Sequence, residues 1–130
     1  MKTHQLTGVA LDWAVAQCEE VELVYDRMHG WWETSDPYYA EPNDPEMFSP
    51  STNWAQGGPI IEREKIELEH MRGAGDAGED VWVATRMERP AFAEASGSTM
   101  LEAAMRCYVE SKLGDEVEIP EELLTKGESK

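Results

Sequence analysis

The chain has 130 residues, and its 27 acidic against 11 basic residues give a formal net charge of -16 at pH 7. This length predicts one domain with a single core, and the shortage of Lys and Arg argues against direct binding to a nucleic-acid backbone. The sequence has no long apolar run, and its first residues, MKTHQLTG, lack the features of a leader peptide. We therefore expect a cytoplasmic protein without membrane spans.

The first predicted element is a helix that begins after Thr7, which is its expected N-cap. Leu6 lies just ahead of this cap, and apolar residues follow at helical spacing. These residues are Ala10, Trp13, Ala14 and Cys18. We expect this face of the helix to lie in the core.

A half-buried strand is predicted next, over residues 21–26, because apolar and acidic side chains nearly alternate in VELVYD. Residues 27–47 then lose any regular pattern and combine three prolines and scattered acids with four aromatic residues. The aromatic residues are Trp31, Trp32, Tyr38 and Tyr39. We predict a long irregular excursion whose aromatic side chains either pack against the domain or contact a partner.

The segment from Phe48 to Glu64, FSPSTNWAQGGPIIERE, combines turn chemistry with a large aromatic residue. Its proline and hydroxyl residues predict a turn, and Trp54 is expected to anchor that turn on the core. The two adjacent glycines are expected to adopt backbone angles closed to other residues. Pro59 is expected at the first position of a short helix that includes Ile60 and Ile61.

This ordered segment has two interpretations: a rigid corner between packed elements, or a binding site for a ligand or partner. The second interpretation makes nine of its residues candidates for binding. They are Ser49, Ser51, Thr52, Asn53, Trp54, Gln56, Gly57, Gly58 and Arg63.

Two alternating runs, residues 66–71 and 81–87, predict an antiparallel hairpin around the glycine-rich loop 72–80. Ile66, Leu68 and His70 share one side of the first run. We therefore expect His70 to be a half-buried histidine with satisfied polar atoms, and not a general base.

The last helix is predicted by a capping box of Thr99 with Glu102, by Lys112 in its last turn and by Gly114 at its C-cap. Its apolar stripe consists of Leu101, Ala104, Met105 and Tyr108. We expect this helix to pack on the sheet. Beyond Pro120 we expect a short turn over residues 121–124 and a frayed tail over residues 125–130.

The cysteine and histidine residues that could bind a metal ion are scattered along the chain. Cys18, Cys107, His29 and His70 lack the close paired spacing of zinc ligands, and both cysteines are expected to be reduced thiols. The sequence therefore predicts no metal site and no cofactor.

Four nearby glutamates, Glu62, Glu64, Glu67 and Glu69, are expected to form a solvated face, because basic residues are interleaved among them. No motif identifies a base for a serine nucleophile, so we predict no catalytic residue.

Three blocks of the sequence are distinctive: LTGVALDWAVAQCE (residues 6–19), SPSTNWAQGGPIIERE (residues 49–64) and AAMRCYVESKLGDEVEIPEEL (residues 103–123). Together they resemble the phage NinX family, small accessory proteins of the nin region of tailed phages and prophages. Asn53 stands where an acidic residue is common in that family, and residues 27–47 and 72–80 are particular to this chain. The resemblance implies a protein of the host cytoplasm with no established molecular activity.

The fold expected from these elements is a single α+β domain over residues 1–130. Its N- and C-terminal helices pack on a small, mostly antiparallel sheet, and residues 27–47 and 72–80 form irregular loops. The residues expected in or near the core are Trp13, Trp54, Trp82, Leu101, Met105 and Tyr108.

Three hypotheses for function follow. We favour a non-enzymatic accessory protein that binds and modulates a host or phage protein; if the acidic surface imitates DNA, the partner is a nucleic-acid-binding protein. The second hypothesis is a small-ligand or nucleotide site built from the Trp54–Gly58 loop and a nearby Arg63 or Arg106. The third is an enzyme, which requires a base within hydrogen-bond reach of Ser49, Ser51 or Thr52.

Overall fold

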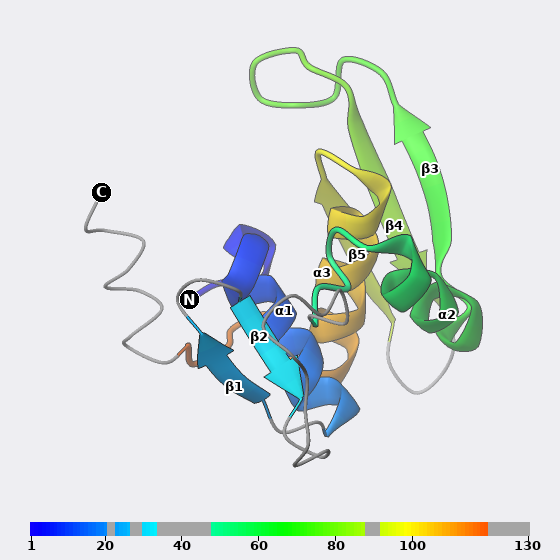
Figure 1. Cartoon of the computed structure of the whole chain (residues 1–130). Helices are drawn as coiled ribbons and strands as arrows, with labels where there is room; N and C mark the ends of the chain where they lie inside the picture. Colours follow the sequence, from blue (N-terminus) through cyan, green and yellow to red (C-terminus); the bar gives the residue numbers. More distant parts are fainter. Residues whose placement is uncertain (21–22, 27–29, 34–47, 88–91, 120–130) are drawn as a thin grey trace.

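The computed structural model describes residues 1–20, 23–26, 30–33, 48–87 and 92–119 (Figure 1). It confirms the α+β class, with a three-stranded antiparallel sheet packed against the last helix. The elements in chain order are η1 (Thr3–Gln5), α1 (Gly8–Glu19), β1 (Leu23–Asp26), β2 (Gly30–Glu33), α2 (Trp54–Glu64), β3 (Glu67–Met71), β4 (Val81–Arg86), β5 (Ala93–Gly97) and α3 (Met100–Leu113). The expected turn over residues 121–124 and the expected tail lie outside the described residues. Within the described residues, no helix has the length and apolarity needed to cross a membrane.

The predicted hairpin is confirmed and forms two strands of a three-stranded sheet with the order β3-β4-β5. Leu68 pairs with Ala84, and His70 pairs with Trp82, so these four residues share one face of the sheet. The third strand, β5, was not predicted. Its alternation is carried by small residues, Ala93, Ala95 and Gly97, which give little hydrophobic signal.

Helix α3 lies at the centre of the molecule, between the sheet and α1 (Figure 1). Leu101, Met105 and Tyr108 are buried as predicted, and the Thr99 side chain accepts a hydrogen bond from the Glu102 N–H at 3.0 Å. A Cβ atom on Gly97 would lie 2.7 Å from the backbone nitrogen of Ala103. Strand β5 therefore needs small residues because the backbone of α3 runs directly against it.

The N-terminal helix is confirmed, and Leu6 and Ala14 are fully buried as expected, but the rest of the buried face differs from the expected stripe. Leu11 and Val15 are fully buried, whereas Trp13 and Cys18 only pack against the edge of the core. Thr7 occupies the N-cap position, yet its hydroxyl donates to the Glu102 carboxylate at 2.7 Å and caps nothing in its own helix. The helix is apolar on most of its circumference because it lies between α3 and other elements.

The predicted strand over residues 21–26 is observed as β1, which pairs with β2 in an antiparallel hairpin with Val24 opposite Trp32. The prediction that residues 27–47 are irregular throughout is therefore wrong for Gly30–Glu33. Adjacent aromatic residues at 31 and 32 hide the alternation that normally marks a strand. The rest of that excursion, residues 27–29 and 34–47, lies outside the described residues.

Candidate functional site

The segment that follows Phe48 leads into α2, which is longer than the sequence predicted. The helix begins at Trp54, so Pro59 lies in its interior and not at its first position. Asn53 is the N-cap, and its side-chain oxygen accepts a hydrogen bond from the Ala55 N–H at 2.9 Å. An aspartate could make the same contact, so this capping role does not depend on an acid at position 53.

Neither glycine of this helix has a positive φ, so the expectation of backbone angles closed to other residues is wrong. Gly57 is buried, and a Cβ atom on it would lie 2.5 Å from the Pro50 carbonyl oxygen and 2.6 Å from a methyl carbon of Leu101. A Cβ atom on Gly58 would lie 3.7 Å from the Trp54 ring, which is ordinary contact. The turn and α3 both lie so close to α2 at this position that only glycine fits there.

Trp54 is 51% exposed, so the prediction that it anchors the segment in the core is wrong. It lies at the edge of an open groove with a volume of about 420 Å³ between the start of α2, strand β4 and the start of α3. The groove is lined by uncharged residues. They are Ser51, Thr52, Trp54, Trp82, Ser98, Thr99, Met100 and Leu101, and we call this surface the Trp54 groove.

A buried carboxylate lies directly behind the groove. Asp12 of α1 is 5% exposed and accepts a hydrogen bond from the Ser51 N–H at 2.9 Å. Burial raises the pKa of Asp12 to about 6, and the neighbouring N–H and hydroxyl groups of Ser51 only partly offset that effect. The Ser51 hydroxyl is buried beside this carboxylate and helps to lower its pKa, although no hydrogen bond of full geometry joins the two groups. Asp12 is thus the acidic side chain that the fold places beside Ser51.

Asp12→Asn is expected to become progressively more stable, relative to the wild type, as the pH rises. The folded pKa lies above the ordinary value of 3.8, so the stability contributed by protonated Asp12 is lost as the pH rises from 3.8 through about 6. Asparagine keeps the acceptor for Ser51 without the buried charge. Between pH 5 and pH 7.5 the difference in free energy of unfolding should shift by about 1.4 kcal/mol, measured by urea denaturation. A difference that does not change with pH would contradict the assignment.

The nine candidate residues from the sequence fall into separate places. Ser51, Thr52 and Trp54 line the Trp54 groove. Within the turn, the Ser49 N–H donates to the Gln56 side-chain oxygen at 2.6 Å. Asn53, Gly57 and Gly58 belong to the capped helix described above.

Arg63 lies at the far end of α2 and is not part of the groove. Arg106, the alternative arginine, donates to the carbonyl oxygens of Leu6 and Ser96, each at 2.8 Å. The pocket of Trp54, two glycines and an arginine that the ligand hypothesis requires is therefore not assembled around these side chains. Sequence reasoning missed Asp12 and the groove residues from β4 and α3, because only the fold brings them beside Trp54.

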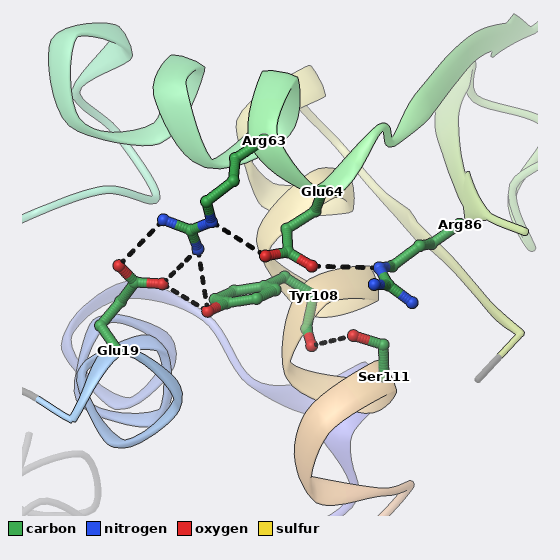
Figure 2. Close-up of polar contacts among 6 residues, drawn as sticks. All are labelled: Glu19, Arg63, Glu64, Arg86, Tyr108 and Ser111. Atoms are coloured by element: carbon green, nitrogen blue, oxygen red, sulfur yellow. Dashed lines mark hydrogen bonds and ion pairs between the residues drawn. The ribbon is translucent and has the colours of Figure 1, made fainter. Parts of the chain in front are cut away.

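Arg63 instead belongs to an ionic cluster that joins three helices and the sheet (Figure 2). The cluster consists of Glu19, Arg63, Glu64, Arg86 and Tyr108. The guanidinium of Arg63 contacts Glu19 at 2.5 Å and 3.3 Å, Glu64 at 2.9 Å and the Tyr108 hydroxyl at 3.1 Å. Arg86 donates to the other oxygen of Glu64 at 3.1 Å, and Tyr108 donates to Glu19.

Glu64 is 8% exposed, so the prediction that it belongs to a solvated face is wrong. Burial raises its pKa, but the hydrogen bond from Arg63 and the charges of Lys112, Arg63 and Arg86 outweigh burial and lower it. Burial and the bond to Glu19 raise the pKa of Tyr108. The protonated tyrosine and the paired arginines and glutamates hold these elements together.

His70 lies beside Trp82 on the sheet and is half-buried, as predicted. Its side chain is 40% exposed, its ring centroid lies 4.8 Å from that of Trp82, and its Nε2 is 3.4 Å from Asp80. Among the described residues no group of three or more His, Cys, Asp or Glu side chains is placed to hold a metal ion.

The family model described as "Bacteriophage P22, NinX" matches residues 2–112 of the chain. That match includes the helices that carry Asp12 and Tyr108, as well as the segment that forms α2. A search of the curated proteins finds no match.

Proposed function

The chain belongs to the phage P22 NinX family. We propose that it is a non-enzymatic accessory protein that binds a host or phage protein in the host cytoplasm and alters its activity. The binding surface is the Trp54 groove. The residues that carry the proposal come from the start of α2, from β4 and from the start of α3.

The exposure of Trp54 on a rigid segment is the observation that supports this function. A half-exposed indole presents apolar surface to water, and such residues are enriched among the anchors of protein interfaces. The cap at Asn53, the close contact of Gly57 with Pro50 and the bond from Ser51 to Asp12 hold the segment in place. A site whose backbone is already ordered loses little entropy when a partner binds.

The net charge of -16 favours a basic partner. A nucleic-acid-binding protein fits this requirement, because its basic groove would accept carboxylates in place of phosphates. This part of the proposal predicts capture that weakens at high ionic strength. Capture that is undiminished in concentrated salt would exclude imitation of DNA.

Trp54→Ala is expected to reduce partner capture strongly while leaving the protein folded. The tagged protein would be captured from infected or lysogenic cells, with the partner identified by mass spectrometry. Removal of an interface tryptophan should reduce the recovered partner about tenfold or more. Because the indole is half exposed, the loss of unfolding free energy should be only about 1 to 2 kcal/mol.

Phe92→Ala is the matched control, because Phe92 is 66% exposed but does not line the groove. It should retain the partner. Equal recovery with wild type and Trp54→Ala would contradict the groove as the binding surface. Recovery of only a small molecule would instead favour the second candidate, a nucleotide or other flat ligand stacked on Trp54.

A further inference from the structure

Helix α3 covers one face of the three-stranded sheet (Figure 1), and the side chains of the opposite face are exposed or only partly buried. Gly97, which pairs with Trp82, lies against the backbone of α3, so the positions that alternate with these two point away from that helix. We call this side the outer sheet face. Its strand positions are Glu67, Glu69 and Met71 on β3, Val81, Val83 and Thr85 on β4, and Glu94 and Ser96 on β5.

A band of apolar side chains runs along the middle of the outer sheet face. Val81 lies opposite Met71, and Val83 follows on the same strand. Directly beyond the last pair of β4 and β5, alternation places Met87 and Phe92 on the same side. Met87 is 64% exposed and Phe92 is 66% exposed. An antiparallel sheet normally turns polar side chains to water, so this apolar band marks an interaction surface.

Carboxylates border the apolar band on both sides. Glu67 of β3 and Glu94 of β5 both pair with Thr85, so they flank β4 from opposite sides. Glu69 lies beside Val83 on the β3 side. No lysine or arginine occupies an outward position of the described strands β3, β4 and β5. The band is therefore apolar, and its border is negative on both sides.

The dimensions of the outer sheet face fit a single α-helix. The two strand spacings from β3 to β5 span about 10 Å, which is the diameter of a helix with its side chains. Strand β4 with Met87 spans about 20 Å, which is the length of a helix of about 13 residues. An extended strand fits less well, because its side chains point alternately up and down. It could not place apolar and basic groups side by side on one face.

The charge of the outer sheet face argues against other occupants. A second copy of the chain would bring the same carboxylates against each other, because a twofold contact places a patch against its own copy. Nucleic acids and anionic lipid surfaces carry the same sign of charge as the border. An uncharged apolar helix would cover the band but leave the bordering carboxylates without partners.

We propose that the outer sheet face binds a basic amphipathic helix of a partner protein. The apolar residues of that helix cover the band along β4, and its Lys or Arg side chains lie on both flanks beside Glu67, Glu69 and Glu94. Apolar burial supplies the affinity, and the paired charges fix the orientation. Methionine suits such a surface, because its flexible side chain adapts to the shape of a partner.

The outer sheet face is separate from the Trp54 groove. Trp82, which lines the groove, lies on the face of the sheet that packs against α3, so one short segment cannot occupy both places. Binding at the outer sheet face therefore goes beyond the proposed function and does not depend on it.

The test uses the full chain and three synthetic peptides of about 18 residues, a length at which a helix can form. The first contains alanine, a row of leucines at helical spacing and lysines on both sides of that row. The second has the same composition in an order that destroys the row, and the third carries glutamate in place of each lysine. Binding is followed by NMR through the methyl signals of Met71 and Met87, assigned with single Met→Leu variants. The first peptide should move both signals and bind about tenfold more tightly than either of the others.

Phe92→Ala removes an exposed part of the apolar band and should weaken binding of the first peptide about fivefold. Glu94→Gln removes one charge of the border and should weaken it about twofold to fivefold. Glu62→Gln is the matched control, because it removes an exposed carboxylate on α2, away from the outer sheet face, and should leave the affinity unchanged. Trp54→Ala should bind the first peptide as the wild type does.

Four results would overturn the proposal. They are equal affinity for the peptide without the leucine row, tighter binding of the glutamate peptide, binding that leaves the signals of Met71 and Met87 in place, and equal weakening by Glu94→Gln and Glu62→Gln. Movement of the two signals with protein concentration alone would show that a second copy covers the face. If peptide binding depends on Trp54 and not on Phe92, the outer sheet face is wrong and the Trp54 groove stands.

Discussion

Gly57→Ala is expected to lower the free energy of unfolding by about 2 to 3 kcal/mol. The added Cβ would lie 2.5 Å from the Pro50 carbonyl oxygen and 2.6 Å from a Leu101 methyl carbon. The Pro50 oxygen belongs to the backbone, so it cannot move away by a change of rotamer. Relief requires α2 to move away from the turn and from α3. The small gain in helix propensity from alanine does not offset this strain. Urea denaturation followed by circular dichroism measures the effect.

Gly58→Ala is the control at the neighbouring position and should have the opposite sign. Its Cβ would meet only the Trp54 ring at 3.7 Å, which is ordinary contact, so the variant should be more stable by about 0.5 to 1 kcal/mol. Equal losses in both variants would show that the helix needs glycine flexibility. That result would contradict the close approach as the reason for Gly57.

Glu64→Ala is expected to cost about 3 kcal/mol of unfolding free energy. Glu64 is 8% exposed and accepts hydrogen bonds from Arg63 and Arg86. Its removal therefore takes away one charged acceptor from each of the two guanidinium groups. The value lies at the low end for a broken buried ion pair, because the Arg63 side chain is half exposed and also holds Glu19.

Glu62→Ala removes a solvent-exposed glutamate from the same helix and should change stability by less than about 0.5 kcal/mol. The pH dependence gives a second check. The pKa of Glu64 is lowered, so its contribution is present above the ordinary glutamate pKa of 4.5 and is lost as the pH falls through the folded value. The difference between wild type and Glu64→Ala should therefore shrink in acid; a constant difference would point to packing alone.

The elements with strong local signals were predicted well. The capping pair of Thr99 with Glu102 and the stripe through Leu101, Met105 and Tyr108 identified α3, and alternation identified the β3–β4 hairpin. Residues three or four positions apart on a helix, or two apart on a strand, face the same side of their element whatever surrounds it. Such patterns can be detected before any tertiary contact is known.

Elements with mixed signals were missed or misplaced. The start of α2 was hidden by two glycines and Pro59, although Asn53 is a strong helix cap. Strand β5 was missed because its inward positions are small, and they are small because α3 packs directly against Gly97. Gly57 and Gly97 are small because each lies against α3, which is distant from both in the sequence.

Three properties follow from the order and composition of the residues alone: the acidic charge, the class of the fold and the family. Each depends on composition, local periodicity or the order of motifs. Three other features depend on how the elements pack together: Trp54 is exposed, Asp12 lies behind Ser51, and Arg63 joins Glu19 and Glu64. The reason is physical: these contacts exist because α1, α2 and β4 all pack on α3. A side chain's burial and charge partners depend on that packing and not on its immediate neighbours along the chain.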